Sequence, residues 1–322
     1  MNNMEQQYGK GAIKDTPDKR DFQYSEVAFS LPPFDWEAGY DIETIIGKKL
    51  KVKDQDGSGS CGGQAWAYYG EVLDVTDHEE KSAKFIYSQT FVGGGGSAGR
   101  TNCELVINKG WADENKCISY ENGFPPSEAF MERKSDLTKE AFDDAFIDRG
   151  LSYANVAANI DLVAQAIREN KGLVIGIAGK NNGTWTSKFP KPPTDLVGSW
   201  NHWVYVGKAK MIDGKKYIGF INSWGEDVGD KGWQWISEDY VKYPLVWSVW
   251  TMVFDFPLYK FTKTMRFGSI GSEVKQLQKR VGVSQDGIFG WRTRNAVIQY
   301  QKSHGLKGDG IVGPLTRAVL NK

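Results

Sequence analysis

The stretch DQDGSGSCGGQAWAYYG, residues 54–70, places Cys61 six residues after Gln55 and directly before a run of apolar residues at helical spacing. That spacing predicts a helix over residues 62–75 with one apolar face. The apolar positions are Ala65, Trp66, Tyr69, Val72 and Leu73. Cys61 then lies at the positive end of the helix dipole, which lowers a thiol pKa from about 8.5 to roughly 3.5–7.5. The pattern predicts a thiolate nucleophile beside the side-chain amide of Gln55.

The alternative for Cys61 is a buried structural cysteine, because free cysteines often behave as small hydrophobic side chains. The glycines at 57, 59, 62 and 63 argue against it. They let the backbone turn tightly and let a substrate chain approach the sulfur. A Gly-Ser-Cys-Gly turn favours the nucleophile over the structural cysteine.

Two downstream segments supply the expected partners of this cysteine. Residues 201–207 read as a strand that begins at His202, and residues 216–222 as a strand that ends at Asn222. His202 follows Cys61 by 141 residues (202 − 61) and Asn222 follows it by 161 (222 − 61). Papain-type histidine and asparagine partners follow their cysteine by about 130 to 150 residues. Taken singly, a core histidine and a turn asparagine are the ordinary interpretations, and only the combination indicates catalysis.

Gln55, Gly59-Ser60-Cys61, Asn201-His202 and Asn222-Ser223-Trp224-Gly225, in this order, resemble a papain-family cysteine peptidase. The resemblance extends over residues 31–255, from Leu31-Pro32-Pro33-Phe34-Asp35-Trp36 onward. It implies an α+β fold of two lobes, a helical lobe over about 31–145 and a β-rich lobe over about 146–255. The active-site cleft is expected between them. Within the second lobe, periodicity predicts a helix over 161–170 and a buried strand over 173–177.

The resemblance also implies a role for each site residue. Cys61 attacks the carbonyl, His202 protonates the leaving amine, and Asn222 orients His202. Gln55 and the backbone N–H of Cys61 stabilise the oxyanion. Trp224 is expected to shield the Asn–His hydrogen bond. The family's substrate-pairing glycine loop corresponds to Gly94, Gly95 and Gly96.

One departure from the family concerns the residues after the nucleophile. Gly62-Gly63-Gln64 stand where the more familiar members have tryptophan and alanine, a variant that resembles a bacterial and viral branch. Substrate preferences therefore cannot be transferred from better-known members.

The carboxy-terminal stretch contains a repeat. Residues 286–294, DGIFGWRTR, recur as residues 309–317, DGIVGPLTR, at an offset of 23. Each copy supplies an Asp-Gly turn and a helix start, with Pro314 suited to a first helical position. Three short apolar faces predict a three-helix bundle, which resembles a two-repeat peptidoglycan-binding module over residues 265–322. A generic helical tail is the alternative, and it does not explain the repeat.

The sequence therefore divides into an extension (1–30), a peptidase domain (31–255), a linker (256–264) and the wall-binding module (265–322). From residue 265 onward, 10 Lys plus Arg face 3 Asp plus Glu, so the module carries +7 and the remainder −7. A basic module suits an anionic cell wall. Nucleic acid is a poorer match, because no recognition helix or aromatic-basic platform accompanies the charge.

Neither a membrane span nor a secretory signal is evident, since no apolar stretch reaches about 18 residues. We expect synthesis in the cytoplasm and action at the wall after release, for example through a phage holin, or delivery in a virion. The extension over 1–30 is shorter than the inhibitory prosegments of many papain relatives, so any masking of the cleft must be short-range. We expect a monomer.

Cofactors and metals are not expected, because His78, His202 and His304 are far apart and lack a zinc-site spacing. Cys103 and Cys117 have two open alternatives, a disulfide or a reduced pair, with the reduced pair favoured in a reducing cytoplasm.

Three functions fit these features. The favoured one is a phage or bacterial lysin that cleaves a stem-peptide or cross-bridge amide of peptidoglycan. The second is a peptidase anchored at the wall, or carried in a virion, that acts on protein. The third is a catalytically inactive wall-binding protein, against which the presence of Cys61, His202, Asn222 and Gln55 argues.

Overall fold

The structure is a computed structural model of the 322-residue chain and describes residues 10–28, 31–74, 77–147, 152–253 and 261–321. The chain divides into two compact units. The first contains residues 1–15 and 28–254, and the second contains residues 16–27 and 255–322. Each unit is described by itself.

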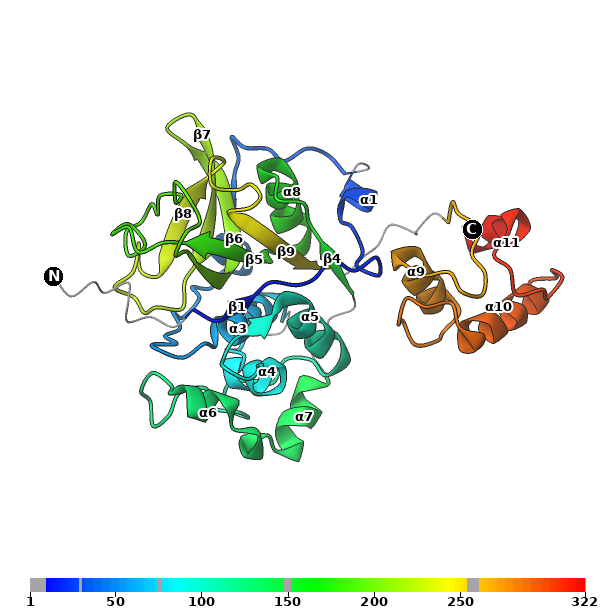
Figure 1. The fold of residues 1–322 in the computed structure, drawn as a ribbon, viewed down its shortest axis with the longest axis horizontal. Helices are drawn as coiled ribbons and strands as arrows, with labels where there is room; N and C mark the ends of the chain where they lie inside the picture. The colour runs from blue at the N-terminus through cyan, green and yellow to red at the C-terminus, as the bar shows by residue number, and fades with distance from the viewer. Residues whose placement is uncertain (1–9, 29–30, 75–76, 148–151, 254–260, 322) are drawn as a thin grey trace. The chain divides into compact units, whose positions relative to one another are not determined.

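One part of the first unit is helical, with α4, α6 and α7 below the large sheet in Figure 1. The helix expected over 62–75 is confirmed as α3, which begins at the nucleophile candidate itself. The helices between residues 31 and 147 are α2 (Ile42–Ile46), α3 (Cys61–Leu73), α4 (Ala83–Thr90), α5 (Gly99–Asn108), α6 (Glu128–Glu132) and α7 (Lys139–Ala145), with a short 3₁₀ helix, η2 (Lys134–Asp136).

Helix α3 is buried on every side rather than on one face, since all its residues from Cys61 to Val72 are buried. Small residues make this possible. A Cβ on Gly70 would lie 2.4 Å from the ring of Trp111, so only glycine admits that ring. The apolar periodicity predicted the helix but not its burial on every side, because the second buried face consists of glycines and polar side chains such as Gln64.

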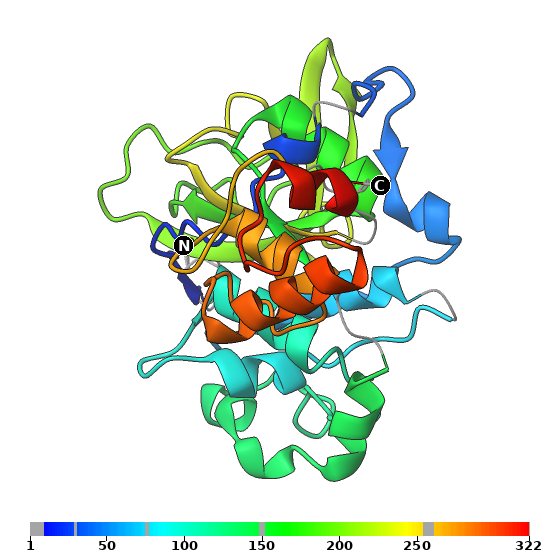
Figure 2. The same cartoon turned by 90° about the vertical axis from the view of Figure 1, so that its right-hand side faces the viewer.

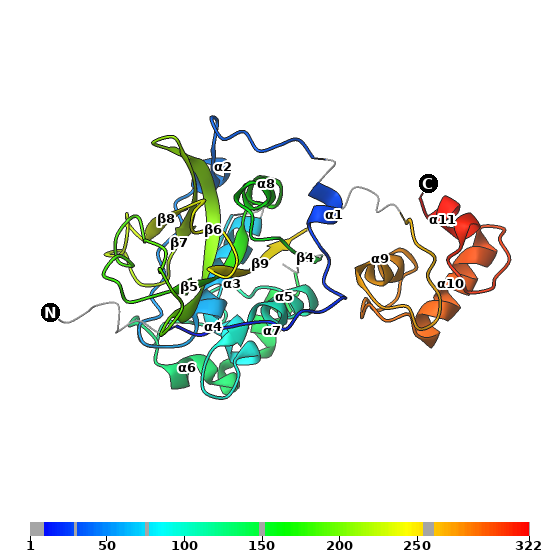
Figure 3. The ribbon, with the colours of Figure 1, turned by 45° about the horizontal axis from the view of Figure 1, so that its top comes forward.

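The second part of the first unit is a seven-stranded sheet in the order β4-β9-β5-β6-β7-β8, with β2 paired to β6. All its pairings are antiparallel. Its strands are β2 (Tyr40–Asp41), β4 (Tyr153–Asn155), β5 (Leu173–Gly179), β6 (Trp200–Ile212), β7 (Lys215–Ile221), β8 (Trp233–Ser237) and β9 (Val246–Met252). Helix α8 (Ile160–Asn170) packs on β5, β6 and β7, as Figure 3 shows.

The expected helix over 161–170 and strand over 173–177 are confirmed as α8 and β5. One segment differs from the expected lobes. Strand β2 and helix α2, from the sequence range assigned to the helical lobe, lie on β6 in the sheet. The physical reason is charge pairing: Glu43 and Asp41 bind the ammonium of Lys208, which is buried on β6.

A separate two-stranded sheet brings the chain's amino-terminal segment into the first unit. Strand β1 (Ala12–Ile13) pairs in parallel with β3 (Ser97–Ala98), just before helix α5. Asp15 fastens the same segment, because it accepts hydrogen bonds from the Arg100 backbone and the Trp250 ring. We call residues 10–15 the strap.

The second unit contains the expected three helices, which appear in orange and red in Figure 2. They are α9 (Ser272–Arg280), α10 (Trp291–Ser303) and α11 (Pro314–Leu320). Their core includes Leu277, Phe289, Val297, Val312 and Leu320.

The repeat in the sequence is also a repeat of hydrogen bonds. The buried amide of Gln278 donates to Asp286 (2.7 Å), and its oxygen accepts from the backbone N–H of Gly287 (2.9 Å). Gln301 makes the same bonds to Asp309 and Gly310, each at 2.9 Å. Each glutamine therefore fixes one Asp-Gly turn against its helix, which explains why the motif recurs as a unit.

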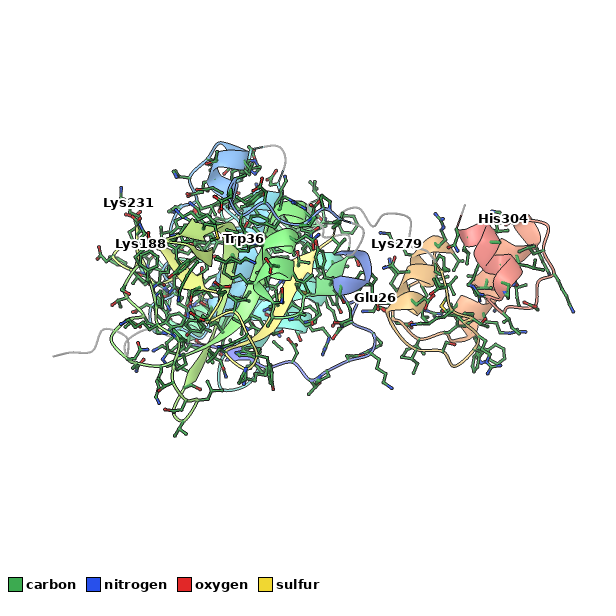
Figure 4. All side chains as sticks on the ribbon, turned by 90° about the horizontal axis from the view of Figure 1, so that it is seen from above. Glu26, Trp36, Lys188, Lys231, Lys279 and His304 are labelled. Atoms are coloured by element: carbon green, nitrogen blue, oxygen red, sulfur yellow. The ribbon has the colours of Figure 1, made fainter. Side chains whose placement is uncertain are left out.

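The second unit also includes residues 16–27. The carbonyl of Lys19 and the side chain of Arg20 lie beside Gly271 and Gly287, and Glu26 (Figure 4) lies near Glu273 of α9. Helix α1 (Ser25–Ala28) ends this segment. The domain boundaries at 30 and 265 stay predictions. Residues 256–260 of the expected linker lie outside the described residues, and Phe261 packs in the core of this unit.

All three cysteines are buried and none forms a disulfide in the structure, as in the favoured alternative of a reduced Cys103 and Cys117. Across the described ranges, no three His, Cys, Asp or Glu side chains are arranged to hold a metal ion. None of the helices described is both long and apolar enough to cross a membrane.

Candidate active site

The nucleophile candidate is the first residue of α3 and is 0% exposed. Its Sγ accepts a hydrogen bond from the backbone N–H of Gly11 at 3.3 Å, and the backbones of Gly62 and Trp203 also hydrogen-bond to it. Trp203 directly follows His202, so the start of β6 lies against the sulfur. The site therefore joins the helical part to the sheet.

The glycine after Cys61 is required by close packing. A Cβ on Gly62 would lie 2.1 Å from Ser97 Oγ, and one on Gly63 would lie 2.5 Å from the carbonyl oxygen of Ala83. Both distances are too short for any side chain. The departure from the familiar tryptophan and alanine thus reflects how closely α4 and β3 approach α3 in this chain.

The expected histidine and asparagine lie on neighbouring strands of the sheet. His202 is on β6 and Asn222 follows the last residue of β7, and both side chains are 0% exposed. His202 Nε2 and Asn222 Oδ1 are 2.9 Å apart. The ring of Trp224 lies against the imidazole, with centroids 4.8 Å apart and the rings tilted by 33°. Its shielding of the hydrogen bond stays a prediction.

A second glutamine, which the sequence analysis missed, determines the orientation of Asn222. The amide of Gln234 on β8 donates to the carbonyl oxygens of Trp185 (2.7 Å) and Ser187 (2.8 Å). Its oxygen must therefore accept from Asn222 Nδ2, at 2.7 Å. Asn222 Oδ1 is left to accept from His202 Nε2–H, and the buried Nδ1 of His202, which has no hydrogen-bond partner within the described residues, is the basic nitrogen.

We predict that Gln234→Leu lowers kcat/KM for amide hydrolysis by about 10- to 100-fold, because the freed Asn222 amide no longer fixes the imidazole. Steady-state kinetics with a peptide substrate measure the change. The matched control is Gln165→Leu, which removes another buried glutamine that binds backbone carbonyls, those of Leu31 and Pro32. Equal losses in both variants would mean that Gln234 acts only on stability.

The oxyanion candidate Gln55 is also fully buried and rigidly held. Its Oε1 accepts from Ser223 Oγ at 2.5 Å, and its Nε2 donates to the carbonyl oxygen of Ser58 at 2.8 Å. An amide nitrogen is a hydrogen-bond donor, so the role of Gln55 in stabilising a substrate oxyanion stays a prediction. Ser223, next to Asn222, thus connects the two halves of the site.

The glycine loop is held by a carboxylate and a phenol that the sequence did not indicate. Tyr87 donates to Glu128 Oε1 at 2.5 Å and accepts from the backbone N–H of Gly96 at 2.6 Å. Glu128 Oε2 accepts from the backbone N–H of Gly59, two residues before the nucleophile. Gly94, Gly95 and Gly96 all have positive φ, from 90° to 95°. Their substrate-binding role stays a prediction.

The strap occupies the site. Gly11 contacts Cys61, its carbonyl oxygen accepts from Ser97 N at 2.9 Å, and Ala12 and Ile13 continue as β1. A Cβ on Gly11 would lie 1.8 Å from the carbonyl oxygen of Gly59, so no other residue fits there. Because an N–H group rather than a carbonyl carbon faces the sulfur, the strap blocks the nucleophile without being positioned for cleavage.

Burial under the strap has the opposite effect on the Cys61 thiol from the one expected of the helix dipole. Burial raises the pKa of the Cys61 thiol to about 11, although the hydrogen bonds from three backbone N–H groups act in the other direction. Burial likewise lowers the pKa of His202 to about 4, against the bond from Asn222. Thiol and imidazole are therefore both neutral at pH 7 in this closed arrangement, and the helix dipole does not overcome desolvation.

We predict a matching pH dependence for alkylation of Cys61 by iodoacetamide. The thiolate is the reactive form, so the rate should rise about tenfold per pH unit from pH 7 to 10 and continue rising toward the pKa. An ordinary thiol would level off above about pH 8.5. Peptide mapping by mass spectrometry separates Cys61 from Cys103 and Cys117, and a plateau below pH 9 at Cys61 would contradict the closed arrangement.

Comparison with solved structures identifies the fold of the first unit. Xylellain, a cysteine protease from Xylella fastidiosa, superposes with a TM-score of 0.62 at 22% identity, over 78% of this chain and 97% of xylellain. Procathepsin B S9 from Trypanosoma congolense gives 0.60 at 16% identity, over 79% and 88% of the two chains. Procathepsin L 3 of Tenebrio molitor gives 0.59 at 15%, over 77% and 76%. The two-lobed papain-like cysteine protease fold is thereby confirmed.

Residues 270–320 match the model of a family described as putative peptidoglycan binding domain. This confirms the module that the repeat predicted. No curated protein matches the chain in sequence.

Proposed function

We propose that this chain is a cysteine peptidase that hydrolyses amide bonds of bacterial peptidoglycan, in a stem peptide or a cross-bridge, as a phage or bacterial lysin. The observation that carries the proposal is the buried Asn222–His202 pair on β6 and at the end of β7, next to Trp203 whose backbone hydrogen-bonds to Cys61, on a chain that also has a peptidoglycan-binding domain. The papain-like fold supports the reaction type. The binding domain supports the substrate and action at the cell wall.

In the proposed reaction, Cys61 Sγ gives its proton to His202 Nδ1 and attacks the amide carbonyl carbon. Gln55 Nε2 and the backbone N–H of Cys61 donate to the oxyanion. His202 then protonates the leaving amine, the C–N bond breaks, and a thioester remains on Cys61. Water, deprotonated by His202, attacks the thioester, so a new carboxyl group is released and the thiol is restored.

The strap has to leave before this reaction begins. It buries the sulfur and keeps both reacting groups neutral. Once water reaches the site, the desolvation that opposes the thiolate falls, and the N-terminus of α3 favours the charged sulfur.

The second unit raises the local concentration of the catalytic unit on the wall. Its net charge favours an anionic polymer, and Trp291, which is 66% exposed, packs against Phe267 with ring centroids 4.8 Å apart on its surface. We infer that wall binding and amide hydrolysis reside in different units.

A second candidate function is hydrolysis of protein by a wall-targeted or virion-borne peptidase. The strap favours it, because a polypeptide segment lies across the site and pairs with β3. To separate the two functions, dye-labelled sacculi and unfolded casein are each incubated with the full chain carrying Gly11→Leu. Release of dye from sacculi that depends on Cys61 supports the lysin, and digestion of casein alone supports the second candidate.

A further inference from the structure

The position of Lys10 in the strap indicates which kind of substrate group can bind in this part of the site. The ammonium of Lys10 lies over two indole rings, 5.0 Å from the centroid of Trp200 and 5.6 Å from that of Trp224. Both distances are within the roughly 6 Å over which an aromatic face attracts a cation. The strap thus places a cation on an aromatic surface inside the site.

The two indoles are held rigidly in place. Trp200 donates its ring N–H to Asn181 Oδ1 at 2.8 Å and packs edge-on against Trp185 at 4.5 Å. Trp224 is 1% exposed and lies 5.8 Å from Trp200 and 6.0 Å from Trp185. A surface fixed in this way needs no rearrangement to receive a cation.

The indole pair lies on the side of the site where the amine leaves. Trp224 stacks on the imidazole of His202, which delivers a proton to the leaving amine. Lys10 is close enough that its charge adds to the effect of burial in lowering the His202 pKa. The strap then passes Cys61 at Gly11 and pairs with Ser97 and Ala98, so the sulfur separates the indoles from the glycine loop.

We propose that Trp200 and Trp224 form a cation-selecting subsite, with Trp200 as the specificity-determining residue. This subsite favours amides whose leaving amine belongs to a diamino acid with a free ammonium group, such as a lysine or diaminopimelate residue of a wall peptide. The inference rests on the proposed function and narrows it to bonds on the amino side of such a residue, in which the amide nitrogen belongs to that residue. Lys10 imitates that ammonium while the strap is bound.

The test compares two peptides that differ only in the residue supplying the leaving amine, lysine or ε-acetyl-lysine. The enzyme is the full chain carrying Gly11→Leu. A cation–π subsite should favour lysine by about 3- to 30-fold in kcat/KM. Adding Trp200→Leu should bring this ratio to about 1.

Trp36→Leu is the matched control for that variant. Trp36 (Figure 4) also lies under a lysine, Lys216, at 5.4 Å, but it is on a different part of the first unit. Its replacement should leave the lysine preference intact. A ratio near 1 without Trp200→Leu, or a ratio that survives Trp200→Leu, would overturn the proposal.

A second measurement tests the subsite without amide hydrolysis, so its failure is separate from failure of the proposed function. In the otherwise unchanged full chain, Lys10→Met and Trp200→Leu should each raise the alkylation rate of Cys61 at pH 7 by about 3- to 10-fold, because each weakens the strap. The double variant should be no faster than the faster single variant. Rates that multiply in the double variant would show that the two residues act independently and would reject the subsite.

Discussion

Cys61→Ala is expected to abolish amide hydrolysis, with a loss in kcat/KM of about 10⁴-fold or more. The variant removes the sulfur that forms the thioester in the proposed reaction, while His202, Asn222 and Gln55 keep their partners elsewhere in the site. Alanine is also smaller than cysteine and fits the fully buried position at the start of α3. Steady-state hydrolysis of a peptide substrate, in the Gly11→Leu chain with and without Cys61→Ala, gives the ratio.

Cys103→Ala is the matched control, because Cys103 is also a thiol outside any disulfide and is 0% exposed. It belongs to α5 and has no part in the proposed reaction, so the rate should stay within about twofold of the parent. Residual hydrolysis above one hundredth of the parent rate in Cys61→Ala would show that another group is the nucleophile.

Gly11→Leu is expected to open the site. With the strap in place, a Cβ at residue 11 collides with the carbonyl oxygen of Gly59, whose backbone is fixed by its hydrogen bond to Glu128. The strap must therefore lift away. The thiol pKa then falls from about 11 toward the ordinary value of about 8.5 or below, which raises the thiolate fraction at pH 7 by at least about 100-fold.

The measurement is the iodoacetamide alkylation rate of Cys61 at pH 7, followed by peptide mapping. Gly290→Ala is the control, since a Cβ there meets no atom within 4 Å and the residue belongs to the second unit. Its alkylation rate should equal that of the parent. An unchanged rate in Gly11→Leu, with an unchanged circular dichroism spectrum, would mean that the strap does not control access to the sulfur.

The sequence was sufficient for the features that depend on local pattern. Helix α3 has clear apolar periodicity, and the papain-like order predicted a cysteine at the start of α3 and a His202–Asn222 pair, which are hydrogen-bonded on neighbouring strands. That the three side chains act together stays a prediction. The second unit was also predictable, because each Asp-Gly turn and its glutamine form one repeated local structure.

The remaining features depend on contacts between distant segments. Gln234 acts through backbone carbonyls near Trp185, and Glu128 acts on Gly59, which precedes it by 69 residues. No spacing rule connects these pairs. The raised pKa of the Cys61 thiol also depends on such a contact. The sequence predicts the helix and its dipole, but the burial that outweighs the dipole comes from the strap.

The sequence also did not show how residues 10–27 divide between the two units. Residues 10–15 belong to the first unit and residues 16–27 to the second, although composition does not change between them. Gly11 carries no pattern that marks it for contact with Cys61. Only the three-dimensional arrangement shows that the short extension is long enough to cover the nucleophile.

The central claim, Cys61-dependent hydrolysis of a wall amide, is tested most directly by mass spectrometry of fragments released from purified sacculi in ¹⁸O-enriched water. The full chain carrying Gly11→Leu should release peptides with a new amine terminus and a new carboxyl group that contains ¹⁸O, and the same chain with Cys61→Ala should release none. Sacculi that bind both proteins yet yield no such termini from either would contradict the account.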